Sequence, residues 1–120
     1  MTDVLDRAAL RSLLEMVGDD PEFVGELVDE YLADAPVQLE AMRAAVAAGD
    51  PASAARPAHT LKGTSSNLGA MELAAACRKI EERARAGAAD GLMELVASAG
   101  AAYERAVAEL GAARARDWRP

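Results

Sequence analysis

Apolar residues recur at intervals of three and four along most of the chain, which is the spacing of an α-helix rather than of a β-strand. The first apolar stripe includes Leu10 and Val17 and lies between Asp6, a typical helix N-cap, and Gly18, a typical helix stop. Segments that alternate Val, Ile or Thr with polar residues, as strands do, are not found in the sequence. The pattern predicts an all-α protein whose first helix is short.

The second predicted helix starts at Asp20 and Pro21, because proline is favoured in the first turn behind a capping aspartate. Its apolar stripe keeps the helical period as far as Gly49. Pro36 lies within this helix, and proline removes a backbone donor and crowds the preceding turn. We therefore expect a kink, or a break into two helices, at residues 33–36.

Asp50 and Pro51 repeat this start signal for a third helix, which we expect to continue to about Leu68. Proline costs up to about 3 kcal/mol in a helix interior and less near the first turn. Pro57 therefore predicts a local distortion of the third helix, one turn before His59.

A fourth helix is expected over residues 71–86, and Gly87 is suited to close it. Asp90 is the expected cap of a fifth helix, whose buried stripe extends to Leu110. Beyond this point the apolar period is lost. We therefore expect residues 111–120, which contain the single tryptophan, to form a flexible tail.

Four long helices joined by short turns, with a shorter one before them, predict an antiparallel four-helix bundle with a short additional N-terminal helix. The 120 residues suit a single domain with a core over about residues 5–110. Hydrophobic residues make up 52% of the chain, yet aromatic residues supply only 3%. Alanine must therefore fill much of the interior, which requires closely packed helices.

Charge and cysteine content argue against several classes of function. The formal net charge of -7 argues against nucleic acid as a ligand, because binding to phosphate backbones relies on clustered lysine and arginine. No uninterrupted run of about 18 apolar residues is present, so no membrane span is expected. One cysteine and the lack of a signal-peptide pattern predict a cytoplasmic protein.

One segment carries polar groups suited to chemistry. Residues three, four and seven apart share a helix face, so one face holds these residues: His59, Lys62, Gly63 and Ser66, with Asn67 beside them. This polar face is expected to face water, whereas another face of the same helix is small and apolar. The only imidazole of the chain thus lies one turn from an ammonium group and from a glycine.

A neutral, accessible imidazole can act as a nucleophile toward phosphorus. Lys62 would supply a positive charge for the phosphoryl oxygens. Glycine in mid-helix costs roughly 0.5 to 1 kcal/mol relative to alanine. The close approach of another molecule to the backbone is a sufficient reason for Gly63.

Other chemistries lack the residues that they need. A zinc site needs three or four ligands, but the chain has one histidine and one cysteine, so we expect no metal and no other cofactor. Cys77 shares the inward stripe of Leu73 and Ile80, which argues against an exposed nucleophile. No glycine-rich nucleotide loop is present, so a phosphoryl group must come from a partner and not from ATP.

The segment from His59 to Gly69 reads His-Thr-Leu-Lys-Gly-Thr-Ser-Ser-Asn-Leu-Gly, and it closely resembles the signature of histidine-containing phosphotransfer (HPt) domains. Three further segments are similar to that family: residues 19–23, 34–36 and 73–81. The resemblance covers about residues 5–110. Thr64 stands where the family usually has serine, and Pro57 is a second departure from its pattern.

The resemblance implies a four-helix bundle that accepts a phosphoryl group on His59 from an aspartyl phosphate in the receiver domain of a hybrid histidine kinase. The bundle would pass this group to the receiver domain of a response regulator, as a phosphocarrier without kinase activity of its own. By position, Lys62 would stabilise the phosphoryl group and Gly63 would clear the approach. Glu81 on the next helix would orient the ring through its other nitrogen. Helical spacing places Arg85 on the same polar face as Glu81, so we expect Arg85 to be a second cation near the site.

Docking of a receiver requires exposed residues around His59, because the aspartate must come within bonding distance while water is excluded. The expected docking surface consists of these residues: Leu13, Met16 and Val17 of the first helix, together with Ser66 and Asn67. The interface should be small and transient, and the protein is expected to be a monomer.

Two other interpretations are open. A non-catalytic helical adaptor would bind and occlude a receiver or a kinase, and His59 would never be phosphorylated. A phosphoacceptor domain of a chemotaxis-type kinase would need a kinase domain, which these 120 residues do not contain. Replacing His59 with glutamine separates carrier from adaptor, because glutamine keeps polarity and approximate size but removes the nucleophile.

Overall fold

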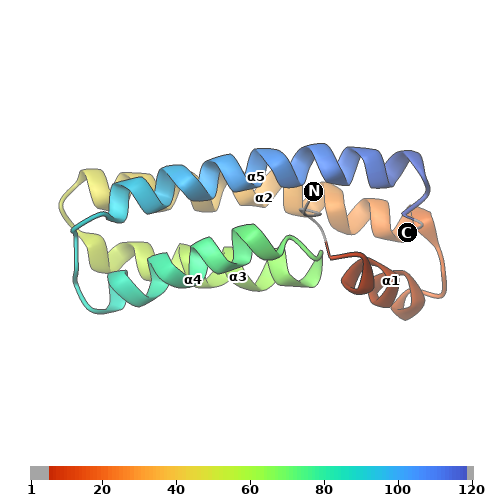
Figure 1. Cartoon of the computed structure of the whole chain (residues 1–120), viewed down its shortest axis with the longest axis horizontal. Coiled ribbons are helices and arrows are strands. Elements are labelled where there is room, and N and C mark those ends of the chain that lie inside the picture. The colour runs from red at the N-terminus through yellow and green to blue at the C-terminus, as the bar shows by residue number, and fades with distance from the viewer. Residues whose placement is uncertain (1–5, 119–120) are drawn as a thin grey trace.

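The computed structural model describes residues 6–118, which contain five α-helices and one 3₁₀ turn. The elements are α1 (Arg7–Met16), α2 (Pro21–Ala47), η1 (Pro51–Ala54), α3 (Ala55–Asn67), α4 (Met71–Arg85) and α5 (Leu92–Ala115). Figure 1 shows α2 and α5 as a long pair, α3 and α4 as a shorter pair beside it, and α1 beyond one end of the shorter pair. The predicted all-α bundle with a short N-terminal helix is confirmed. None of the described helices is both long and apolar enough to cross a membrane.

Two helix starts lie where their capping residues predict them. Asp6 accepts hydrogen bonds from two backbone N–H groups in the first turn of α1, and Asp20 accepts one at the start of α2. The prediction that Asp90 caps α5 is wrong. Gly91 takes the N-cap position with a φ of 72°, and the Asp90 carbonyl instead accepts from Nη1 of Arg83 at 2.5 Å.

Of the kink or break expected at residues 33–36, the break is wrong, because α2 is one continuous helix through Pro36. Proline leaves the carbonyl of Leu32, four residues earlier, without its helical N–H partner. The hydroxyl of Tyr103 on α5 donates to this carbonyl at 3.5 Å, and Ala35 beside the proline is fully buried. Packing of α5 against α2 thus offsets part of the cost of the proline.

The third helix starts later than the sequence predicts. Residues Pro51–Ala54 form the 3₁₀ turn η1, and α3 begins at Ala55. Pro57 therefore lies in the first turn of α3, where a missing N–H costs no intrahelical hydrogen bond. Pro57 does not interrupt α3, because it lies at a helix start rather than in the interior; the departure from regular α-helix lies before it, in η1.

The core consists largely of small and aliphatic side chains, as the composition predicts. Alanines that are at most 2% exposed come from η1, from the α3–α4 turn and from all four helices of the bundle: Ala35, Ala54, Ala58, Ala70, Ala84, Ala99, Ala102, Ala106 and Ala113. Such small side chains allow the helices to approach one another closely. Cys77 is also fully buried, which confirms its place on the inward stripe.

The C-terminal residues pack against the bundle. α5 continues past Gly111 to Ala115, and Trp118 is only 2% exposed. The flexible tail expected from residue 111 is therefore wrong for residues 111–118. Residues 119–120 lie outside the described part of the chain.

Trp118 closes one end of the bundle. Its indole Nε1 donates to the carbonyl of Pro21, the first residue of α2, at 3.0 Å. The guanidinium of Arg114 lies 5.4 Å from the centroid of the indole ring and forms an ion pair with Asp29 on α2 at 2.6 Å. The last turn of α5 is thus attached to the first half of α2, and the core extends beyond the limit predicted near residue 110. The predicted limit at residue 5 lies outside the described residues.

Candidate functional site

The polar faces of α3 and α4 meet at one carboxylate. Oε2 of Glu81 lies 3.0 Å from Nδ1 of His59. The same oxygen accepts from Nε (3.0 Å) and Nη2 (2.7 Å) of Arg85. Oε1 accepts from Nζ of Lys62 at 2.8 Å. Four side chains singled out from the sequence therefore lie together, two from each helix.

Glu81 is nearly buried, whereas its partners are more exposed. The side chain of Glu81 is 9% exposed, and that of His59 is 62% exposed. Hydrogen bonds from Lys62 and then from Arg85 outweigh the effect of burial and lower the pKa of Glu81 to about 2. Glu81 is therefore a carboxylate near neutral pH and only accepts hydrogen bonds.

This carboxylate fixes the tautomer of the neutral imidazole. Because Glu81 only accepts, the proton of the 3.0 Å hydrogen bond must be on Nδ1 of His59. Nε2 of the neutral ring then keeps its lone pair. Nε2 makes no hydrogen bond within residues 6–118, and the side chain is well exposed. The nitrogen with nucleophilic character is thus accessible from outside.

Gly63 follows His59 by one turn on the same exposed face of α3. A Cβ added to Gly63 would have no atom within 4 Å beyond the adjoining helix backbone. Packing within the described residues therefore does not require glycine at this position. The glycine instead keeps the surface beside the imidazole free of side-chain bulk.

Gly69, at the end of the signature segment, has a structural role. Its φ is +79°, a left-handed conformation that favours glycine. Its carbonyl accepts from the backbone N–H of Asp6 at 2.7 Å, and an added Cβ would lie 2.8 Å from the Asp6 carbonyl oxygen. Gly69 therefore attaches the start of α1 to the turn between α3 and α4. This attachment was not predicted, because no local pattern relates two segments so far apart in the sequence.

A buried polar pair fixes α3 against α2. Oγ of Ser65 and Oη of Tyr31 lie 2.9 Å apart. Burial raises the pKa of Tyr31 to about 12, so the phenol keeps its proton at physiological pH. The pair was not predicted, and the signal for it is a serine on an otherwise apolar helix face. It holds the helix that carries His59 against α2.

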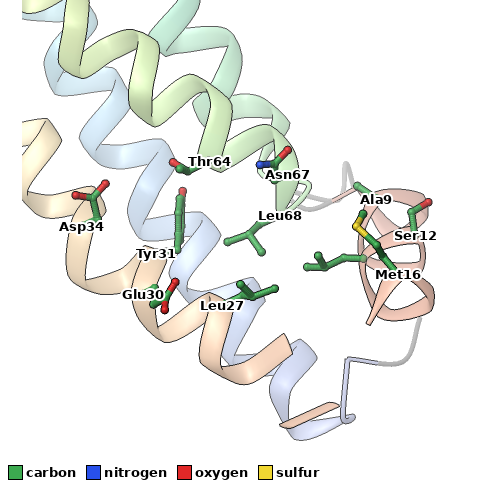
Figure 2. A pocket seen from close by; sticks show the side chains of 11 residues that line it. Ala9, Ser12, Met16, Leu27, Glu30, Tyr31, Asp34, Thr64, Asn67 and Leu68 are labelled. Atoms are coloured by element: carbon green, nitrogen blue, oxygen red, sulfur yellow. The ribbon is translucent and has the colours of Figure 1, made fainter. Parts of the chain in front are cut away.

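A groove of about 600 Å³ lies between α1, α2 and the C-terminal end of α3. Apolar side chains, among them Leu27 and Leu68, line much of it, and Glu30 and Asp34 contribute acidic groups from α2 (Figure 2). The groove begins at Thr64, the residue after Gly63 on the helix that carries His59.

The expected docking residues differ in their exposure and in whether they line the groove. Met16 is 78% exposed and lines the groove together with Asn67 (Figure 2). Leu13 also lines the groove but is only 9% exposed, so its expected exposure is wrong: it packs into the core. Val17 is partly buried against the core, and Ser66 donates its hydroxyl to a backbone carbonyl one turn earlier at 2.9 Å.

Comparisons with known proteins agree with this fold. Residues 26–115 match the family model of the Hpt domain. The crystal structure of histidine-containing phosphotransfer protein B (HptB) from Pseudomonas aeruginosa PAO1 is similar to this chain, with a TM-score of 0.85 and 32% sequence identity. That match covers 97% of this chain and 98% of the other. No curated protein sequence matches the chain.

Proposed function

The chain belongs to the Hpt family, whose members transfer phosphoryl groups through a histidine in phosphorelays, and we propose that His59 is the residue that carries the phosphoryl group. His59 is the only histidine of the chain. The observation that carries the proposal is the hydrogen bond between its Nδ1 and Glu81, which leaves Nε2 unprotonated and accessible.

In the proposed step, the lone pair of Nε2 attacks the phosphorus of an aspartyl phosphate. The Nε2–P bond forms while the bond between phosphorus and the aspartyl oxygen breaks, and the aspartate leaves as a carboxylate. No proton is transferred, because Nδ1 of His59 keeps its hydrogen. The ring gains positive charge, which the Glu81 carboxylate stabilises from 3.0 Å.

Lys62 and Gly63 serve this step in different ways. Nζ of Lys62 already lies within the cluster, 2.8 Å from Glu81, and its positive charge is available to the phosphoryl oxygens. The bare backbone of Gly63 lets an incoming domain approach the imidazole closely. Arg85 brings a second positive charge to the cluster.

Hpt proteins work with receiver domains. In the proposal, the donor receiver belongs to a hybrid histidine kinase and the acceptor receiver to a response regulator. Both would dock on the face that contains His59, Gly63 and the adjoining groove, with Met16 and Asn67 at its edge. The chain would act as a cytoplasmic monomer and phosphocarrier, and its net charge of -7 supports protein rather than nucleic acid as the partner.

Transfer of labelled phosphate from purified receiver domains tests the proposal. Wild-type protein should take up label that is labile in acid and stable in alkali, as phosphohistidine is, and His59→Gln should take up none. Circular dichroism and calorimetric binding to the same receivers show whether the variant is folded and still docks. If no receiver of the source organism labels the wild-type protein although binding is intact, the helical adaptor is the better interpretation.

A further inference from the structure

Two cations share the Glu81 carboxylate, but they hold it differently. Lys62 donates once, to Oε1. Arg85 donates twice to Oε2, the oxygen that also accepts from Nδ1 of His59. Arg85 lies one turn after Glu81 on the same helix, and its planar guanidinium presents the two donors to one oxygen in a fixed geometry. Lys62 reaches across from α3 on a flexible stem.

This difference matters once a phosphoryl group is on Nε2 of His59. A lysine that neutralises the phosphoryl oxygens gives up part of its contact with Glu81. The side chain of Glu81 is 9% exposed, and an unpaired carboxylate in such a position is unfavourable. It would also repel the phosphoryl group. A second cation must therefore keep Glu81 neutralised while Lys62 changes its partner.

We propose that Arg85 is a positioning residue that acts through Glu81: it holds Oε2 against the imidazole and neutralises the carboxylate, so that Lys62 is released to the phosphoryl group. This inference rests on the proposed role of His59. In the opposing model, Arg85 binds the phosphoryl oxygens itself. The contacts favour the first model, because Nε and Nη2 of Arg85 are both already bonded to Glu81.

A double-mutant cycle separates the two models. The full chain is incubated with phosphoramidate, a small donor that releases ammonia and needs no receiver docking, and phosphohistidine is followed by phosphorus NMR. Glu81→Gln keeps an oxygen that accepts from Nδ1 but has no charge to neutralise. Arg85→Gln should slow phosphorylation about tenfold in the wild-type background. It should slow the reaction less than about twofold in the Glu81→Gln background.

Two further variants exclude a merely structural effect. Arg85→Lys keeps the positive charge and should recover roughly half of the wild-type rate, which repacking alone would not restore. Arg83→Gln removes the same charge from α4, but Arg83 donates to the Asp90 carbonyl and not to the cluster. Its rate should stay within about twofold of the wild-type rate.

Equal losses in both backgrounds would show that Arg85 acts on the phosphoryl group directly, and they would overturn the inference. A wild-type rate for Arg85→Gln would overturn it as well. Failure of the proposed function would give a different result. Neither the wild-type protein nor any variant would then form phosphohistidine, whether from phosphoramidate or from a receiver, and both the proposed function and this inference would be wrong.

Discussion

At the scale of single residues, the ion pairs of Glu81 link the site to the stability of the fold. Its pKa is lowered from 4.5 to about 2 by Lys62 and Arg85. Between these values the unfolded chain binds a proton that the folded protein does not. The contribution of Glu81 to the free energy of unfolding is therefore complete above about pH 4.5 and is lost as the pH falls toward 2.

Glu81→Gln should flatten the pH dependence of the free energy of unfolding between about pH 4.5 and 2. The expected difference is on the order of 1 kcal/mol, because water screens the exposed partners of Glu81. Urea unfolding at a series of pH values measures it. Glu82→Gln, a change at an exposed neighbour, should keep the wild-type slope. Parallel curves for wild type and Glu81→Gln would show that these ion pairs add nothing to stability.

Gly63→Ala should stabilise the protein by about 0.5 to 1 kcal/mol, because the new methyl group meets no neighbour and alanine favours the helix. Gly63→Leu should slow transfer from a receiver domain more than it slows phosphorylation by phosphoramidate, since only the receiver needs the open surface. Chemical unfolding and the two rates are the measurements. Gly111→Ala, at a second helical glycine with free space, should stabilise similarly without any effect on transfer. Equal slowing with both donors would contradict a role in docking.

The site residues were predictable to different extents. The alignment of His59 with Lys62 follows from helical spacing, because both lie on one helix. The contact of His59 with Glu81 joins residues 22 positions apart on different helices, and periodicity alone does not give the pairing of two helices. The family resemblance supplied Glu81. Neither spacing nor resemblance shows that Arg85 and His59 share one oxygen of the carboxylate.

At the scale of helices, local chemistry set some boundaries and tertiary contacts set others. The starts at Asp6 and Asp20 follow from capping by side chains next to the helix, which the sequence displays directly. The continuity of α2 at Pro36 depends partly on a hydroxyl from Tyr103, far away in the sequence. The end of α5 depends on the contact of Trp118 with α2, where the indole donates to the carbonyl of Pro21. The pattern of apolar and polar residues along the chain does not predict contacts between such distant residues.

Gly69→Ala should loosen α1, because the added Cβ would lie 2.8 Å from the backbone oxygen of Asp6 and alanine resists a φ of +79°. Hydrogen exchange of the α1 amides should become at least about tenfold faster, which corresponds to about 1.4 kcal/mol. Gly87→Ala is a matched control, since its φ is +68° but its added Cβ meets no atom. Gly87→Ala should lower the free energy of global unfolding, but the ratio of the exchange rates of the α1 amides to those of the other helices should stay unchanged. The same response of α1 to both variants would refute the attachment.

At the scale of the whole molecule, the two long helices are joined at one end by Trp118 and its neighbours. Trp118→Ala should lower the free energy of unfolding by about 3 kcal/mol, the cost of truncating a large buried side chain. Trp118→Phe should recover most of this loss but not the hydrogen bond to Pro21. Urea unfolding of the three proteins measures both effects. A loss within about 0.5 kcal/mol for Trp118→Ala would show that the C-terminal turn does not contribute to the fold.

The exposed Nε2 of His59 also bears on the direction of the relay. The side chain of His59 is 62% exposed and Nε2 makes no hydrogen bond within residues 6–118, so in the proposed function a phosphoryl group would arrive and depart on the same open face. By microscopic reversibility, the forward and backward transfers between His59 and any one receiver would pass through the same transition state. Net flow is then set by mass action, through the relative concentrations of the two receivers and the hydrolytic free energies of their acyl phosphates.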